Sequence, residues 1–303
     1  MSTKREKVLI TGATGFLGQH LVDKIADMGS YVTGIFRSHE PQDESKKNIS
    51  FLRCDLADRE AVEKLFINNY YDTVVHLAGQ MRGNKVIDYL NNTVRSTENL
   101  LSCSEKYGVK RFIQASSIAV YGYVNGEVDE KSDRINLDDY ATAKYLCERL
   151  VSDATIPYRI ALRLPRILGE GMDLSYPWIP KLIRKLLDND DIVYFNPSLP
   201  YNNMAYVENV CEFIEKLRLC DREGYHLIGI ASSDALTVKE IIDTLYEGLG
   251  SRSKMIETKN NIPRNTCHLI DYNRALEYGY KPNTVKETLE KTVADIKREY
   301  GIM

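Results

Sequence analysis

A tyrosine and a lysine stand four positions apart in the segment "DDYATAKYLCERL", at Tyr140 and Lys144. On a helix this spacing puts both side chains on one face, and of the twenty tyrosines only Tyr140 has a lysine four positions on. A tyrosine phenol has a pKa near 10, but a neighbouring ammonium and an oxidised nicotinamide both favour the phenolate. The pair therefore indicates either proton transfer at a partly desolvated site or a helix-surface contact without chemistry.

Two serines, Ser116 and Ser117, end the apolar run "RFIQASS" that precedes this helix. Ligands of an open parallel sheet bind beyond the carboxyl ends of its strands, so the hydroxyl of Ser117 is expected beside the reacting group. The alternative is that both serines satisfy backbone groups in a turn.

Three glycines, Gly12, Gly15 and Gly18, follow an apolar run in "VLITGATGFLGQHL". A strand, a glycine-rich turn and a helix bring unpaired amide groups and the positive end of a helix dipole to one point, where an anion binds. Gly12 would permit the turn, Gly15 the approach of a pyrophosphate, and Gly18 close packing of the helix on the strand. The alternative is an ordinary, tightly packed turn; without a G-K-[ST] sequence it is not a P-loop.

The strand after this turn should end with a residue that faces the adenosine ribose, about 20 residues on. Phe36, Arg37 and Ser38 stand there, and none of the three is a carboxylate that could accept the ribose hydroxyls. Arg37 could pair with a 2′-phosphate, which favours NADP over NAD, or it could be a solvated charge. Asp55, in "RCDLAD", could accept from the adenine amino group or cap a turn.

Short β-branched runs alternate with helical stretches up to about residue 168. Each parallel crossover needs a helix to return the chain, so this pattern predicts a parallel sheet covered on both faces. The expected fold class is α/β, a Rossmann-like doubly wound parallel sheet. The strand candidates are "KVLIT", "YVTGIF", "ISFLRCD", "TVVHLAG", "RFIQASS" and "YRIALRL".

Helical stretches lie between these strands, the longest from residue 84 to 107. Asp58 is expected to cap one helix, and Gly29 and Gly108 to end two others. Beyond residue 169 prolines cluster, and helices are expected near 207–219, 237–249 and 285–300. The sequence Thr-Val-Lys-Glu opens two of them, each as a capping box.

We therefore expect a cofactor-binding domain over residues 1–169. A smaller C-terminal α/β region over 170–303, partly interleaved with it, would supply substrate contacts.

The composition excludes several other classes of function. The formal net charge is −3 and the basic residues are scattered, so the sequence has no basic cluster of the kind that binds nucleic acid. The six cysteines show no C-x-x-C pair and no histidine at ligand spacing, which predicts reduced thiols and no metal site. The charged N-terminus runs straight into a strand, so we expect no signal peptide, no membrane partner and a cytoplasmic protein.

Together, "TGATGFLG", "SSIAVYG" and "YATAK" resemble the extended short-chain dehydrogenase/reductase family, specifically its nucleotide-sugar branch. "RCDLAD", "VVHLAG", "LRLPRILGEGM" and "MAYVENV" resemble further landmarks, so the similarity runs nearly end to end. The resemblance implies that Tyr140 is the general acid/base, that Lys144 holds the nicotinamide ribose, and that Ser117 hydrogen-bonds the reacting oxygen. Besides the residues already named, it implies cofactor contacts at Thr14, Phe16, Leu17, Leu56, Leu77, Ala78, Gly79 and Pro165.

The chain also departs from this family. Its dehydratases usually carry an acidic pair directly after the catalytic hydroxyl, where Ile118 and Ala119 stand here, so elimination of water is disfavoured. Many relatives have Asn in place of Arg166 and Arg in place of Asn202. A rearranged diphosphate clamp is expected, with Arg166 either an anion contact or facing solvent.

Met81 and Arg82 follow the fourth strand and are expected to border the sugar, although Met81 could merely fill a gap.

These observations favour an NADPH-dependent reductase of a nucleotide-linked 4-keto-sugar. The first alternative is an NAD(P)-dependent 4-epimerase that oxidises and re-reduces its sugar on one retained cofactor. A non-catalytic regulatory protein that only binds the cofactor is the second, and it would tolerate loss of Tyr140. The family resemblance further implies a homodimer formed by the helices near 84–107 and 140–153.

Overall fold

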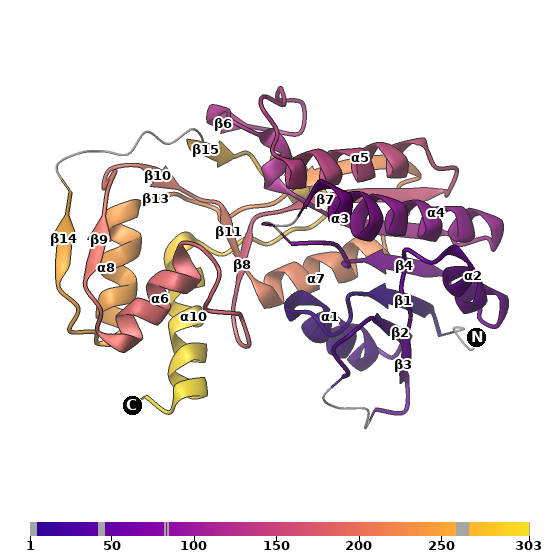
Figure 1. Ribbon diagram of the computed structural model, residues 1–303, viewed down its shortest axis with the longest axis horizontal. Helices are drawn as coiled ribbons and strands as arrows, with labels where there is room; N and C mark the ends of the chain where they lie inside the picture. The colour runs from indigo at the N-terminus through magenta and orange to yellow at the C-terminus, as the bar shows by residue number, and fades with distance from the viewer. Residues whose placement is uncertain (1–4, 42–45, 82, 84, 259–266, 303) are drawn as a thin grey trace. The chain divides into compact units, whose positions relative to one another are not determined.

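The computed structural model describes residues 5–41, 46–81, 83, 85–258 and 267–302 (Figure 1). The chain divides into two compact units. The first comprises residues 1–122, 134–164 and 211–229, and the second comprises 123–133, 165–210 and 230–303. The chain thus passes between the units repeatedly, and the expected division at residue 169 stays a prediction.

A seven-stranded sheet forms the centre of the first unit, in the order β12-β7-β5-β4-β1-β2-β3. All its neighbouring strands pair in parallel, which confirms the predicted doubly wound sheet. The strands are β1 (Lys7–Thr11), β2 (Tyr31–Phe36), β3 (Ile49–Arg53), β4 (Thr73–His76), β5 (Arg111–Ser117), β7 (Tyr158–Leu164) and β12 (Gly224–Gly229).

Six of these strands coincide with the apolar runs of the sequence, because a strand covered on both faces carries apolar side chains on both. In β1, for example, Val8, Leu9 and Ile10 are all fully buried. The seventh strand, β12, was not predicted. It lies at one edge beside β7, and its first four residues are only partly buried, so its apolar pattern is short.

The helices of the first unit begin and end largely where the sequence indicates. Asp58 accepts hydrogen bonds from the backbone N–H groups of Glu60 and Ala61, as a helix cap does, and Gly29 and Gly108 have positive φ. The helices are α1 (Phe16–Asp27), α2 (Arg59–Ile67), α3 (Val86–Tyr89), α4 (Ser96–Lys106), α5 (Asp139–Asp153) and the 3₁₀ turn η2 (Ile118–Tyr121). Helix α7 (Val207–Arg218) begins in the second unit and ends in the first.

The long helical stretch expected from residue 84 to 107 is interrupted. A π-helical turn, η1 (Leu90–Arg95), separates α3 from α4, and Asn84 lies outside the described residues. Such turns are rare and occur frequently at functional sites. Helices α4 and α5 lie side by side over one face of the sheet (Figure 1).

The second unit combines four helices of the described chain with pairs of short strands. The helices are α6 (Ile179–Asp188), α8 (Val238–Leu249), α9 (Asn273–Glu277) and α10 (Val285–Tyr300). The strand pairs are β8 (Arg166–Leu168) with β11 (Met204–Tyr206), β9 (Ile192–Tyr194) with β14 (Met255–Glu257), β10 (Pro200–Tyr201) with β13 (Leu236–Thr237), and β6 (Asn125–Val128) with β15 (Cys267–Ile270).

Both predicted capping boxes are present in this unit. Thr237 with Glu240 opens α8, and Thr284 with Glu287 opens α10. Among the described residues of the whole chain, none of the helices combines the length and apolar character needed to traverse a membrane.

Candidate active site

The glycine-rich turn between β1 and α1 is built from close backbone contacts. Gly12 has a φ of +67°, and a Cβ there would lie 2.9 Å from the backbone nitrogen of Ala78, at the end of β4. A Cβ on Gly18 would collide with the carbonyl oxygen of Gly12. The turn is therefore tight, and α1 lies directly against it.

The first turn of α1 can accept an anion. Gly15, at the N-cap position, has no side chain to satisfy the first amides, and the first turn contains no acidic residue. Unpaired N–H groups and the helix dipole then favour a negatively charged group at this point. A pyrophosphate fits this description.

A cavity of about 230 Å³ opens beside this turn, at the carboxyl ends of β1 to β4. Seven predicted cofactor residues line it: Gly12, Thr14, Arg37, Asp55, Leu56, Ala78 and Gly79. Gly15, Phe16, Leu17, Gly18 and Leu77 belong to the turn, α1 and the end of β4 but are not among the lining residues. The lining also includes residues that were not predicted as contacts, among them His39, Gln80, Asn92 and Ser96.

Arg37 lies in this cavity at the end of β2. Its guanidinium donates a hydrogen bond to the side-chain oxygen of Asn92, at 3.2 Å, and its carbonyl accepts one from Arg53, at 2.9 Å. Asn92 belongs to the π-helical turn η1, and no local sequence signal indicates that this turn faces β2. Asp55 accepts a hydrogen bond from the backbone N–H of Ala57, at 3.0 Å, so it does cap a turn while also lining the cavity.

Lys144 lies beside the same cavity. It is only 6% exposed, and its Nζ donates a 2.8 Å hydrogen bond to the carbonyl of Ala115 on β5. A Cβ added to Gly79, which lines the cavity, would come within 3.3 Å of this Nζ. The ammonium is thus held at the rim of the predicted cofactor site.

Tyr140 is half-buried, one helical turn before Lys144 on α5. Its ring packs edge-to-face against Tyr89, with 6.1 Å between the ring centroids. Tyr89 is buried and donates a hydrogen bond to the carbonyl of Met81, at 3.1 Å. The side chain of Met81 is exposed, and Arg82 lies outside the described residues.

The two serines at the end of β5 have different partners. The hydroxyl oxygen of Ser117 accepts a bond from the backbone N–H of Ala119, at 3.1 Å, which leaves its proton for another acceptor. Ser116 instead donates to Glu148 of α5, at 2.6 Å. Ser117 therefore combines the turn role with a hydroxyl proton that could reach a substrate oxygen, whereas Ser116 is turned toward the interior.

A buried histidine that the sequence did not single out also belongs to this region. His76, at the end of β4, makes hydrogen bonds to Thr11 of β1 at 2.7 Å and to Thr97 of α4 at 3.0 Å. Burial first, and the charge of Lys144 second, lower the pKa of His76 to about 3. The imidazole is therefore neutral, and it adds no second positive charge next to Lys144.

Three residues of the expected site lie in the second unit: Pro165, Arg166 and Asn202. The guanidinium carbon of Arg166 lies 5.8 Å from the ring centroid of Tyr176. The buried amide of Asn202 bonds to both the N–H and the carbonyl of Ile270, each at 3.0 Å. Asn202 is thus engaged in holding β15, while the roles expected of Pro165 and Arg166 stay predictions.

Comparison with known proteins identifies the family. The model of the NAD dependent epimerase/dehydratase family matches residues 8–226. The chain belongs to this family. The resemblance to the nucleotide-sugar branch of the extended short-chain dehydrogenases/reductases is thereby confirmed, and the protein is an NAD(P)-dependent enzyme of that type.

Several relatives of this family are distant in sequence but match nearly the full length of the chain. A putative UDP-glucose 4-epimerase of Methanocaldococcus jannaschii is 27% identical over 94% of this chain and 97% of the relative. The structure of MoeE5 in complex with UDP-glucuronic acid and NAD is 26% identical, with a TM-score of 0.83 over 97% of this chain and 99% of that one. A UDP-glucose 4-epimerase of Thermotoga maritima shares the fold, with a TM-score of 0.82 at 23% identity over 97% of this chain and 99% of that one.

Proposed function

We propose that this family member is an NADPH-dependent reductase of a nucleotide-linked 4-keto-sugar. The observation that carries the proposal is Arg37, whose guanidinium lines the cavity at the end of β2, where a carboxylate would select NAD. A guanidinium suits a 2′-phosphate through charge-assisted hydrogen bonds. Preference for NADP fits an enzyme that takes up a fresh reduced cofactor in every cycle.

The residues present fit a dinucleotide. The uncapped start of α1 would hold the pyrophosphate, Arg37 the ribose phosphate, and Lys144 the nicotinamide ribose. When bound, the reduced nicotinamide supplies a hydride to the sugar carbon.

Three side chains of the first unit would carry the proton chemistry. Tyr140 gives its phenolic proton to the sugar oxygen as that oxygen gains negative charge. Lys144, one turn further along α5, stabilises the resulting phenolate. Ser117 donates a hydrogen bond to the same oxygen. General acid catalysis of this kind contributes about 10²–10⁴ in rate.

Loss of water is not expected. The residues after Ser117 are Ile118 and Ala119, within the turn η2, and neither can protonate a leaving hydroxyl.

A second candidate is a nucleotide-sugar 4-epimerase. The observation that favours it is the similarity over nearly the full length to a putative UDP-glucose 4-epimerase, and the cavity residues would accept NAD as well. Tyr140, Lys144 and Ser117 would serve this reaction too. In an epimerase, Tyr140 would first accept a proton from the sugar hydroxyl and later return one, whereas in a reductase it only donates a proton.

A stoichiometric assay separates the two candidates. The protein is freed of bound cofactor and mixed with NADPH and a 4-keto nucleotide sugar. A reductase oxidises one NADPH for each hydroxy-sugar formed, measured by absorbance and chromatography. Interconversion of two hydroxy-sugars without net oxidation of added NADPH would exclude the reductase and establish the epimerase.

We also propose a homodimer. Apolar side chains are exposed on neighbouring elements of the first unit, namely Val86, Ile87 and Leu90 on α3 and η1, and Leu146 on α5. Sedimentation should report twice the chain mass of 34.6 kDa, and Leu146→Glu should shift it toward the monomer. A wild-type protein that sediments as a monomer would exclude this interface.

A further inference from the structure

A charged cluster is buried beneath the catalytic residues of the first unit. Arg163 of β7 is fully buried and Glu148 of α5 is 2% exposed. The Nε and one Nη of Arg163 each donate a 2.9 Å hydrogen bond to Glu148, one to each carboxylate oxygen. Ser116 donates a 2.6 Å bond to the same carboxylate.

The guanidinium of Arg163 also contacts the segment that follows Ser117. Its carbon lies 4.7 Å from the ring centroid of Tyr121, which is fully buried at the end of η2. Burial alone would lower the pKa of Arg163, but its bonds to Glu148 and its contact with Tyr121 outweigh this and raise the pKa, so the guanidinium stays charged.

The cluster therefore connects the segment that contains Ser117 with helix α5, which contains Tyr140 and Lys144. Ser116 and Tyr121 flank the short segment that holds Ser117, and Glu148 lies on the helix that holds Tyr140 and Lys144. On α5 the spacing of Tyr140, Lys144 and Glu148 is four residues each, so all three lie on one face. Lys144 adds a second polar bond to β5, through Ala115.

Stability does not explain such a pair. Removing two charges from water costs about as much as their attraction returns, and apolar residues of similar volume often stabilise a core equally well. Apolar contacts, however, have no preferred direction, unlike hydrogen bonds. A bidentate bond fixes the distance and the rotation of a helix relative to a strand, whereas apolar side chains can slide.

We propose that the Glu148–Arg163 pair positions α5 and the Ser117 segment relative to each other, so that Tyr140 and Ser117 reach the same substrate oxygen. The inference rests on the proposed function, since it assigns positioning residues for that chemistry. Glu148 and Arg163 act through Tyr140 and Ser117 and do not themselves contact the substrate.

The expected effect follows from helix geometry. A phenolic oxygen on α5 lies roughly 8 Å from the helix axis, so a rotation of about 10° moves it by about 1.4 Å. A misplacement of about 1 Å costs about 100-fold in rate at a reacting centre. Loss of the pair should therefore lower kcat by about 10- to 100-fold.

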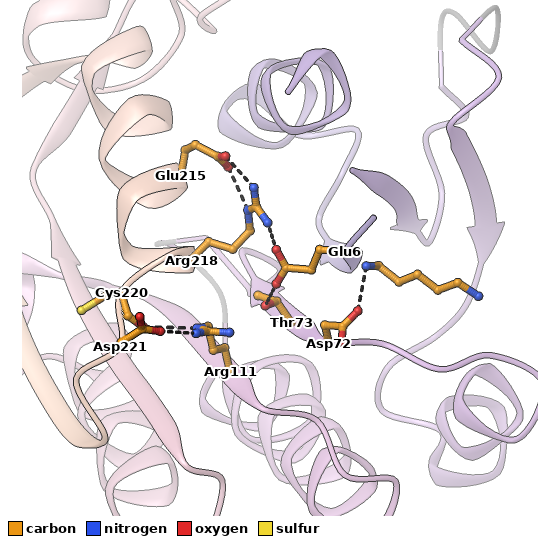
Figure 2. A network of polar contacts seen from close by, with 9 residues as sticks. Glu6, Asp72, Thr73, Arg111, Glu215, Arg218, Cys220 and Asp221 are labelled. Carbon is orange, nitrogen blue, oxygen red and sulfur yellow. Dashed lines mark hydrogen bonds and ion pairs between the residues drawn. The ribbon is translucent and has the colours of Figure 1, made fainter. Parts of the chain in front are cut away.

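The test replaces both charges at once, in Glu148→Leu/Arg163→Met, so that neither is left buried without a partner. A matched control is available at the amino-terminal ends of the strands, whereas the cavity lies at their carboxyl ends (Figure 2). There Arg218 of α7 donates bonds of 2.8 and 2.5 Å to both carboxylate oxygens of Glu215 and also pairs with Glu6, which precedes β1. Glu6→Gln/Glu215→Leu/Arg218→Met removes all the charges of this cluster far from the cavity, so that here too no buried charge is left without a partner.

The predicted result is a separation of activity from stability. In Glu148→Leu/Arg163→Met, the thermal midpoint stays within a few degrees of the wild type while kcat falls about 10- to 100-fold. KM and the Kd for NADPH stay within threefold. Tyr140 and Lys144 lie on the same helix and move together, so the loss of kcat appears at every pH and not as a shift of the pH–rate profile. The control variant keeps the wild-type kcat and pH profile.

Wild-type kcat in the Glu148→Leu/Arg163→Met protein would overturn the proposal. So would a loss of kcat of equal size in the control variant. If the variant unfolds, Arg163→Lys replaces it: this change keeps the charge but breaks the bidentate geometry, and retention of full kcat would again overturn the proposal.

Failure of the proposed function is recognised separately. If the wild-type protein itself turns over no nucleotide sugar, that function is wrong, and hydrogen exchange then tests the positioning without any substrate. Faster exchange confined to residues 116–122 and 139–146 in the double variant supports the pair as a positioning device, and unchanged exchange in both segments refutes it.

Discussion

Lowering the pH should destabilise this protein through one buried histidine. His76 is 2% exposed and hydrogen-bonded to Thr11 and Thr97, and its folded-state pKa is about 3. In the unfolded chain a histidine has a pKa of about 6.5. Between these two values the unfolded state binds a proton that the folded state excludes, so the free energy of unfolding is highest above pH 6.5 and falls as the pH drops toward 3.

The size of this effect follows from the pKa difference. Each pH unit within the window costs about 1.36 kcal/mol per group. At pH 5.0, about 1.5 units into the window, His76 should have removed about 2 kcal/mol from the free energy of unfolding. Over the whole window the loss is about 5 kcal/mol.

Urea unfolding of the wild type and of His76→Gln at pH 7.5 and 5.0 measures this contribution. A glutamine can still bond to the two threonines but does not titrate, so its loss of stability between the two pH values should be smaller by about 2 kcal/mol. His39→Gln, at an exposed position, should retain the wild-type pH dependence. An equal loss in the wild type and in His76→Gln would refute the buried, neutral histidine.

Three further predictions concern the cofactor turn and the site. Gly18→Ala should abolish cofactor binding and lower the thermal midpoint, because its Cβ meets the Gly12 carbonyl; retention of NADPH binding by calorimetry would contradict this. Arg37→Ser should weaken NADPH binding about 10- to 100-fold, corresponding to about 1.5–3 kcal/mol, while NADH affinity changes less than threefold; equal losses for both cofactors in a fluorescence titration would argue against a 2′-phosphate contact. Ser117→Ala should reduce kcat about 10- to 100-fold with little change in KM, and an unchanged kcat would remove Ser117 from the chemistry.

Features of the fold that depend on residues close together in the sequence could be predicted from the sequence. Asp58, Thr237 and Thr284 cap helices through bonds to amides two or three residues away, so their role needs no distant partner. The glycine turn and the Tyr140–Lys144 spacing are also local patterns. Gly12 and Thr14 of the turn line a cavity, and Tyr140 and Lys144 lie on one helix, while their roles in binding and catalysis stay predictions.

What escaped prediction depends on contacts between distant segments. Arg163 and Glu148 are 15 residues apart, and only the packing of α5 on β7 brings them together. In the sequence, His76 is indistinguishable from an ordinary strand residue, because its burial depends on contacts with the distant segments β1 and α4. The turn of η1 that brings Asn92 to Arg37 departs from the α-helical period, so a search for that period cannot find it.

In the proposed reaction, the hydroxyl of Tyr140 moves the proton while a bound nicotinamide exchanges the hydride. Single-turnover kinetics of Tyr140→Phe, with Tyr145→Phe on the same helix as the control, test it most directly. Tyr140→Phe should lose at least 100-fold in the rate of hydride transfer, with an NADPH Kd within threefold of the wild type, and Tyr145→Phe should keep both values. Hydride transfer at the wild-type rate in Tyr140→Phe would contradict the proposed reaction.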